Sequence, residues 1–95
     1  MTEITPEQHQ LMESAIDQAI EFLNKEIPDW KSKINWNIFD FYSTRLCIAG
    51  QLEIPFRSNQ GFYVPESITS ELSYFLTKNA YHYMGEIWKQ KAKPV

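Results

Sequence analysis

The central stretch of the chain, residues 39–52, places the strongest restriction on how the chain can fold. Within it, residues 44–52 have the pattern of a short helix, with Ser43 as its N-cap and the only cysteine, Cys47, inside it. Apolar side chains surround this helix on almost every side, and such a helix is normally buried. Gly50 is unfavourable inside a helix, so it indicates either close approach of another backbone or an early end to the helix. We therefore expect the rest of the chain to wrap around this segment.

A longer amphipathic helix is predicted before this segment, over residues 6–27. Thr5 is a suitable N-cap, and Gln8 completes a capping-box pattern with it. Pro28 ends the helix, because the residue before a proline avoids the helical region. One face of the helix is apolar at three- and four-residue spacing and is expected to face the core. Its members are Leu11, Met12, Ala15, Ile16, Ala19, Ile20 and Leu23.

The region between these two helices is predicted to be irregular or weakly β. Asp29 is placed to cap a single helical turn over residues 30–33. Residues 34–38 then alternate between apolar side chains and asparagines, which is the period of a strand. The only segment suited to pair with such a strand is residues 61–64.

A final helix is predicted over residues 66–91, with two apolar lines along it. The core stripe consists of Ile68, Leu72, Phe75, Leu76, Ala80, Tyr83 and Ile87. This stripe drifts past Asn79, so we expect a kink or break near Lys78 and Asn79. The second line has heptad spacing and is predicted to form the interface of a homodimer. It consists of Tyr74, Tyr81 and Trp88, with Gly85 beside them. The alternative is that the same chain covers both faces of the helix.

The segment 53–65 has the composition of a loop and carries candidate binding residues. It contains two prolines and one glycine, which are typical of turns. Loop aromatics beside an arginine are typical of contact surfaces. The predicted surface, for a protein or a ligand, consists of Phe56, Arg57, Phe62 and Tyr63. The alternative is that these aromatic side chains fold back and close the core.

The whole chain, residues 1–95, is predicted to be a single, mainly α domain of three main helices. Its length fits one domain with one modest core. Three Trp, five Tyr and six Phe are more than such a core needs, so some are expected on a surface. The net charge is −3 and the acidic excess lies in residues 1–27, which argues against nucleic-acid binding. Neither a secretion signal nor a membrane-spanning run is apparent, so we expect a cytoplasmic protein without membrane contact.

No arrangement of residues in the sequence predicts catalysis, a metal site or a cofactor. A cysteine nucleophile needs a nearby base, and neither His9 nor His82 is placed beside Cys47. A buried structural thiol is therefore predicted, and a cysteine enzyme is the least favoured interpretation. Two i,i+4 pairs, His9 with Glu13 and His82 with Glu86, supply too few ligands for a metal ion. We expect the chain not to be an enzyme.

Several short segments occur in an order that resembles a known group of proteins. They are Phe22-Leu23, Pro28-x-Trp30-x-x-x-Ile34, Phe39-Asp40, Cys47-Ile48-Ala49-Gly50-Gln51-Leu52, Gly61-Phe62 and Trp88. Together they resemble a family of small uncharacterised proteins encoded by bacteriophages and their bacterial hosts. In that family a larger aliphatic residue often stands at the place of Ala49, and polar residues or cysteine often precede Cys47. The resemblance implies no activity, but it favours an accessory protein of a phage or mobile element.

These observations favour a non-enzymatic protein-interaction module, such as a phage-encoded modulator or inhibitor of a host defence factor. The aromatic excess, the second apolar line of the last helix and the lack of catalytic residues all indicate this function. The alternative is an oligomer that binds a small molecule or nucleotide. In that case the loop aromatics stack on the ligand, and Arg45 or Arg57 pairs with its phosphate or carboxylate.

Overall fold

The first predicted helix is present as α1 (Pro6–Glu26) in the computed structural model, which describes residues 4–54, 60–70 and 72–93. Its capping box forms as the sequence predicts. The Thr5 hydroxyl accepts a hydrogen bond from the Gln8 backbone N–H at 3.1 Å, and the Gln8 side chain accepts one from the Thr5 N–H at 3.0 Å. The helix ends two residues before Pro28. Its buried face consists of Met12, Ala15, Ile16, Ala19 and Leu23.

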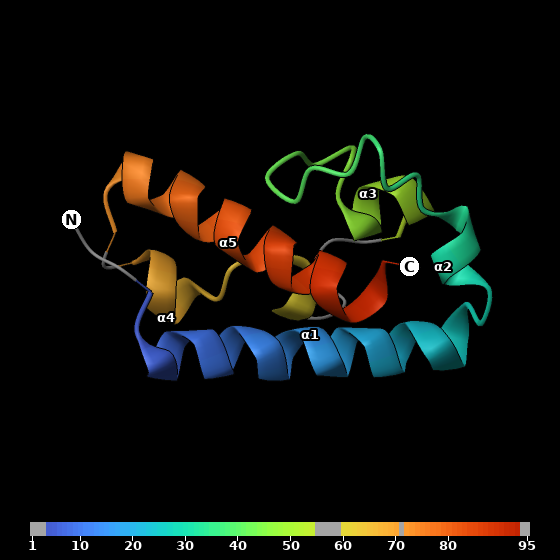
Figure 1. Ribbon diagram of the computed structural model, residues 1–95, viewed down its shortest axis with the longest axis horizontal. Helices are drawn as coiled ribbons and strands as arrows, with labels where there is room; N and C mark the ends of the chain where they lie inside the picture. The colour runs from blue at the N-terminus through green and yellow to red at the C-terminus, as the bar shows by residue number, and fades with distance from the viewer. Residues whose placement is uncertain (1–3, 55–59, 71, 94–95) are drawn as a thin grey trace.

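The described residues are mainly helical and contain no strand, and the last helix lies in the middle of the arrangement (Figure 1). α5 (Tyr74–Ala92) runs in the same direction as α1 and lies between α1 and the segment 34–52. Two short elements, η2 (Gln60–Phe62) and α4 (Glu66–Thr69), lie between α1 and α5. The radius of gyration, 12.7 Å, is that of a compact chain of this length. Among the described residues, no helix is long and apolar enough to cross a membrane.

The chain after α2 (Trp30–Lys33) forms turns, so of the two predicted alternatives, irregular or weakly β, residues 34–38 are irregular. The Asn35 side chain accepts a hydrogen bond from the Asn37 N–H at 3.1 Å. The Asn35 carbonyl accepts another from the Ile38 N–H at 3.3 Å. Asparagine commonly bends the backbone in this way, because its side chain competes for the N–H groups that a strand would use. η2, which was expected to form part of the partner strand, packs on α1 instead.

The central helix is shorter than predicted. α3 spans Ile48–Leu52, and Cys47 is its N-cap, with the sulfur accepting a hydrogen bond from the Gly50 N–H at 3.4 Å. The preceding residues form turns, because the Ser43 hydroxyl accepts bonds from the N–H groups two and three residues later. The close backbone approach predicted at Gly50 is confirmed, since a side chain there would collide with the carbonyl of Thr44.

The last predicted helix is divided into two helices. α4 ends at Thr69, and α5 begins after Ser73, whose hydroxyl accepts a hydrogen bond from the Leu76 N–H at 3.4 Å. α5 then continues without interruption through residues 78–79, so the break lies earlier in the chain than the predicted kink. A new start changes the helical phase, and the buried face of α5 therefore differs from the predicted stripe. Among the described side chains of α5, the buried hydrophobic ones are Ala80, Met84, Ile87, Trp88 and Ala92, and Gly85 is buried with them.

Trp88 is at the centre of the core. Its ring is stacked on Phe62, with the centroids 6.1 Å apart and the planes inclined by 12°. The ring also meets Trp30 edge-on at a centroid distance of 6.1 Å. Its indole N–H donates to the Gly61 carbonyl at 2.9 Å, and the Gly61 backbone in turn lies against Ala15 of α1. One side chain thus connects α5 with α2 and η2, and through η2 with α1.

Glu53, which ends α3, is expected to limit the stability of the fold. Its backbone φ is 57°, in the left-handed region that favours glycine. Glu53→Gly is therefore expected to raise the free energy of unfolding by about 0.5–1 kcal/mol. Glu53→Ala is the control, because it removes the same side chain and keeps the unfavourable backbone conformation. Urea unfolding compares the three proteins, and equal stability of the glycine and alanine variants would contradict this account.

Candidate functional site

Aromatic side chains form a continuous run from the loop before α3 onto the surface of α5. Neighbouring rings in the run have centroids 5.2–6.5 Å apart, within the range of favourable aromatic contacts. In order of contact, the rings are Trp36, Phe39, Phe41, Tyr81 and Tyr42. Four of the five come from residues 36–42, a stretch that carries no regular secondary structure. The run therefore fixes this loop on α5 by ring packing.

Two successive turns hold the Tyr42 ring outward. The Asp40 carboxylate accepts a hydrogen bond from the Tyr42 N–H at 3.0 Å, and the Asp40 carbonyl accepts one from the Ser43 N–H at 3.0 Å. The Ser43 hydroxyl then accepts from the N–H groups of Arg45 and Leu46, both at 3.2 Å. Tyr42 remains 39% exposed. Local hydrogen bonding therefore keeps a large aromatic side chain in contact with solvent.

The side chain of Gln51 joins the two ends of this loop. Its carbonyl oxygen accepts a hydrogen bond from the Asn35 N–H at 2.7 Å. Its amide nitrogen donates to the Asn35 carbonyl at 3.3 Å and to the Leu46 carbonyl at 2.8 Å. All three bonds agree with one orientation of the amide. α3 thus closes the loop 35–46 through a single side chain.

Two hollows lie on either side of the Phe41–Tyr42 pair, which lines both of them. The charged hollow has a volume of about 400 Å³. Its ionisable lining residues are Asp40, Lys78, His82, Glu86 and Lys89. The aromatic hollow has a volume of about 540 Å³, and none of the described residues that line it is charged. The other residues that line it are Ser43, Thr44, Phe62, Tyr63, Thr77 and Tyr81. We call Ile38, Tyr42 and these two hollows the contact surface.

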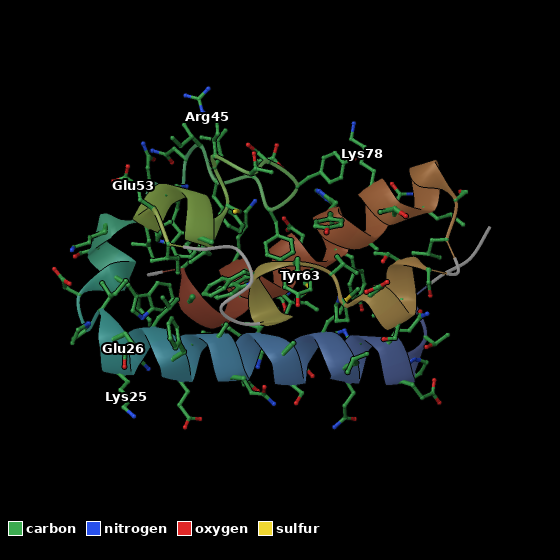
Figure 2. The ribbon with its side chains drawn as sticks, turned by 180° about the vertical axis from the view of Figure 1, so that it is seen from behind. Lys25, Glu26, Arg45, Glu53, Tyr63 and Lys78 are labelled. Atoms are coloured by element: carbon green, nitrogen blue, oxygen red, sulfur yellow. The ribbon has the colours of Figure 1, made fainter. Side chains whose placement is uncertain are left out.

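The charges of the charged hollow are partly satisfied within the chain. Lys89 forms an ion pair with Glu86 at 3.1 Å, and the Asp40 carboxylate accepts the backbone bond described above. Lys78 forms no ion pair in the part of the chain that the structure describes. Figure 2 shows Lys78 and Arg45 pointing away from the body of the molecule on the side opposite α1. Lys78 is therefore available to an acidic group that approaches the hollow.

The loop surface predicted from sequence is divided between core and surface. Phe62 is 2% exposed and belongs to the core, as the alternative interpretation expects, and it also lines the aromatic hollow. The reason is that η2 packs on α1, which turns the Phe62 ring inward onto the core. Tyr63 is half-buried and lines the aromatic hollow. Phe56 and Arg57 lie outside the described residues.

The predicted dimer interface lies mostly inside the chain. Trp88 is fully buried, and Gly85 is covered by Phe41, whose Cβ lies 3.0 Å from the position of a Cβ on Gly85. Tyr81 is half-buried against Phe41 at a centroid distance of 5.7 Å. The Tyr74 side chain lies outside the described part of the structure. The assignment of Trp88 and Gly85 to an interface is therefore corrected, because the loop before α3 covers this face of α5.

Of the residues predicted as binding or interface residues, Phe62, Tyr63, Tyr81 and Gly85 line the two hollows. The sequence patterns do not single out Ile38 and Tyr42, which are 48% and 39% exposed and lie in the connection predicted to be irregular or weakly β. The available signal was the order Asp40-Phe41-Tyr42-Ser43, in which turn-forming residues flank two aromatics. Such flanking residues favour a turn that presents one ring to solvent.

The burial predicted for Cys47 is confirmed, because its side chain is 1% exposed. Burial raises the pKa of the Cys47 thiol above its ordinary value of 9.0, and the backbone N–H of Gly50 opposes this rise. Burial also raises the pKa of Tyr81, and a hydrogen bond to Asp17 raises that of Lys91. Within the described residues, no three His, Cys, Asp or Glu side chains gather where they could hold a metal ion.

The three raised pKa values predict a loss of stability at alkaline pH. Each group keeps its proton in the folded chain at a pH where the unfolded chain loses it, so the stabilisation is complete below pH 9.0 and declines above it. We expect the free energy of unfolding, measured with urea, to be constant up to about pH 9 and to fall at higher pH. Cys47→Ala should remove the earliest part of this fall, because Cys47 has the lowest ordinary pKa of the three. A flat profile above pH 9, or rapid modification of the native thiol, would contradict its burial.

Comparison of the chain with protein-family models, with curated proteins and with solved structures finds no match in any of the three. The functional argument therefore depends on the geometry of the chain itself.

Proposed function

We propose that the protein is a non-enzymatic protein-interaction module that binds another protein through the contact surface. The observation that carries this proposal is the position of Tyr42, an exposed ring between two hollows that it helps to line. Tyrosine is enriched at the centres of protein interfaces, where it supplies a large contact area with little loss of conformational freedom. The hydrogen-bonded turns around Tyr42 reduce that loss further, because the ring is held in place before binding.

The two hollows favour different side chains of the partner. The described residues that line the aromatic hollow carry no charge, so this hollow suits an apolar or aromatic side chain. The charged hollow suits a polar side chain, and Lys78 on its rim favours a carboxylate. A partner segment that crosses Tyr42 and places one side chain in each hollow fits this arrangement.

The small-molecule alternative receives less support from the same geometry. It relies on Arg45 or Arg57 to hold an anionic group. Arg45 points away from the body of the molecule and lines neither hollow, and Arg57 is outside the described residues (Figure 2). The resemblance to phage proteins extends the proposal to a cytoplasmic host protein as the partner.

The test compares two exposed apolar side chains of equal exposure. Tyr42 and Leu11 are each 39% exposed, but Leu11 lies on α1, away from both hollows. Proteins that bind the unmodified chain in a host lysate are identified, purified and titrated by calorimetry against Tyr42→Ala and Leu11→Ala. We expect Tyr42→Ala to raise the Kd of the true partner at least about tenfold, as for an interface hot spot, and Leu11→Ala to leave it unchanged.

Circular dichroism confirms that both variants remain folded. A partner that binds both variants equally well would contradict the proposal. Sedimentation of the unmodified chain tests a second copy as the partner. A dimer that Tyr42→Ala dissociates would assign the contact surface to self-association.

A further inference from the structure

A second group of side chains joins a phenol to an imidazole and a carboxylate beside a third hollow, which shares His82 and Glu86 with the charged hollow. The hydroxyl of Tyr83 lies 2.7 Å from Nδ1 of His9, and Nε2 of His9 lies 3.3 Å from a carboxylate oxygen of Glu13. His9 and Glu13 belong to α1 and Tyr83 to α5, 74 residues away from His9. The three groups are therefore brought together by the packing of the two long helices.

The positions of the three groups define the direction in which a proton can move. The Glu13 carboxylate lies beside Nε2, which favours the tautomer with its proton on Nε2, and in that tautomer the lone pair of Nδ1 faces the Tyr83 hydroxyl. Lys91 lies 3.6 Å from the other oxygen of Glu13 and 2.9 Å from Asp17, so the carboxylate is held in place from α5. Activated nucleophiles in proteins usually have this arrangement: the nucleophile lies within hydrogen-bond reach of a base, and a third group orients the base.

This group opens onto a hollow of about 300 Å³, separate from the aromatic hollow. His9 and Tyr83 line it, together with Asn79, His82 and Glu86. Asn79 precedes Tyr83 by one helical turn, so its amide N–H groups are on the same side of α5 as the phenol. Such donors stabilise the negative charge that develops on a carbonyl oxygen under attack.

We propose that Tyr83 is an activated phenol that accepts an acyl group from a small, uncharged acyl donor bound in this hollow. The phenol oxygen attacks the acyl carbon, and a new O–C bond forms while the bond from that carbon to the leaving group breaks. The phenol proton moves to Nδ1 of His9, which then transfers it to the departing group. The products are an acyl ester on Tyr83 and the protonated leaving group, with no oxidant or reductant required.

The test uses N-acetylimidazole, an acyl donor whose leaving group is imidazole, on the full chain. Peptide mass spectrometry follows the acetylation rates of Tyr83 and Tyr42 in the same sample. Exposure alone predicts that Tyr42 reacts first, because Tyr42 is 39% exposed and Tyr83 is more deeply buried. The proposal predicts the reverse order, with Tyr83 at least about tenfold faster, as expected from the lower range of general-base catalysis. A Tyr83 rate at or below that of Tyr42 overturns it.

Two matched variants assign the effect to His9. His9→Gln should lower the Tyr83 rate about tenfold or more and leave the Tyr42 rate unchanged. Leu11→Ala changes an exposed side chain on the same helix as His9 but outside all three hollows, and it should change neither rate. Equal Tyr83 rates in these two variants would overturn the role of His9. If His9→Gln fails to fold, the ratio of the Tyr83 and Tyr42 acetylation rates in the unmodified protein tests the proposal by itself.

Glu13 is a positioning residue in this proposal, and its variants distinguish orientation from simple stability. Glu13→Gln keeps an oxygen that can accept a hydrogen bond from Nε2–H, so this variant should retain most of the acetylation rate of Tyr83. Glu13→Leu removes that acceptor and should reduce the Tyr83 rate toward that of His9→Gln. A Glu13→Leu variant that melts at the same temperature and keeps the full rate would remove Glu13 from the proposal.

Discussion

Trp88→Ala is expected to lower the free energy of unfolding by about 3–5 kcal/mol, the range for loss of a large aromatic side chain from a core. The Trp88 side chain is fully buried, so its removal leaves a cavity beside Phe62 and Trp30. The substitution also removes the indole hydrogen bond to the Gly61 carbonyl. Small domains are stable by only about 5–15 kcal/mol, so this variant is expected to be partly unfolded at moderate temperature.

Trp88→Phe is the matched variant for this prediction. Phenylalanine keeps a ring over Phe62 but lacks the N–H that donates to Gly61 and fills less volume. Trp88→Phe is expected to lower the free energy of unfolding by about 1–3 kcal/mol, clearly less than Trp88→Ala. Urea unfolding followed by circular dichroism measures both. A Trp88→Ala midpoint close to that of the unmodified protein would show that the stacked pair is not central to the fold.

Gly61→Ala is expected to lower the free energy of unfolding by about 3 kcal/mol or more, at the upper end of the range for overpacking. A Cβ at this position would lie 2.5 Å from the Ala19 Cβ and would also collide with the Ala15 carbonyl oxygen. A backbone carbonyl within a helix cannot move aside as the end of a side chain can. The collision therefore separates η2 from α1 and disturbs the contacts of Trp88 with Gly61 and Phe62.

Gly85→Ala is the control for this effect, because it is the same substitution against a different neighbour. Its new Cβ would meet a side-chain atom, the Cβ of Phe41, at 3.0 Å. Alanine also gains about 1 kcal/mol of helix propensity over glycine in the interior of α5. We expect a thermal midpoint near that of the unmodified protein for Gly85→Ala and a much lower one for Gly61→Ala. Similar losses in the two variants would contradict the role assigned to the Gly61 backbone.

Local signals in the sequence were sufficient for the first part of the fold. The capping box at Thr5 and the stop at Pro28 are made by residues close together in the chain, and α1 follows them closely. The burial of Cys47 and the crowding at Gly50 also follow from short apolar patterns. These features could be predicted because no distant contact is needed to decide them.

The candidate site depends on contacts that no local pattern contains. The Tyr81 ring meets Phe41 across 40 residues and Tyr42 across 39. The residues of the heptad line do lie along α5 at the predicted spacing. The loop that carries Phe41 packs on Tyr81 and Gly85 of this line, so the same chain covers it. The start of α5 at Ser73 has no proline or glycine to mark it, so the phase of its buried face was also missed.

The parallel placement of α1 and α5 has a consequence for the order of events during synthesis. α1 leaves the ribosome first, yet its apolar face is closed by η2 and α5, which are made much later. Helix formation in α1 can be early and local, whereas closure of its apolar face must await the arrival of α5. A nascent chain that stalls before Trp88 would expose Met12, Ile16 and Leu23, and chaperones that bind apolar segments would recognise it at that stage.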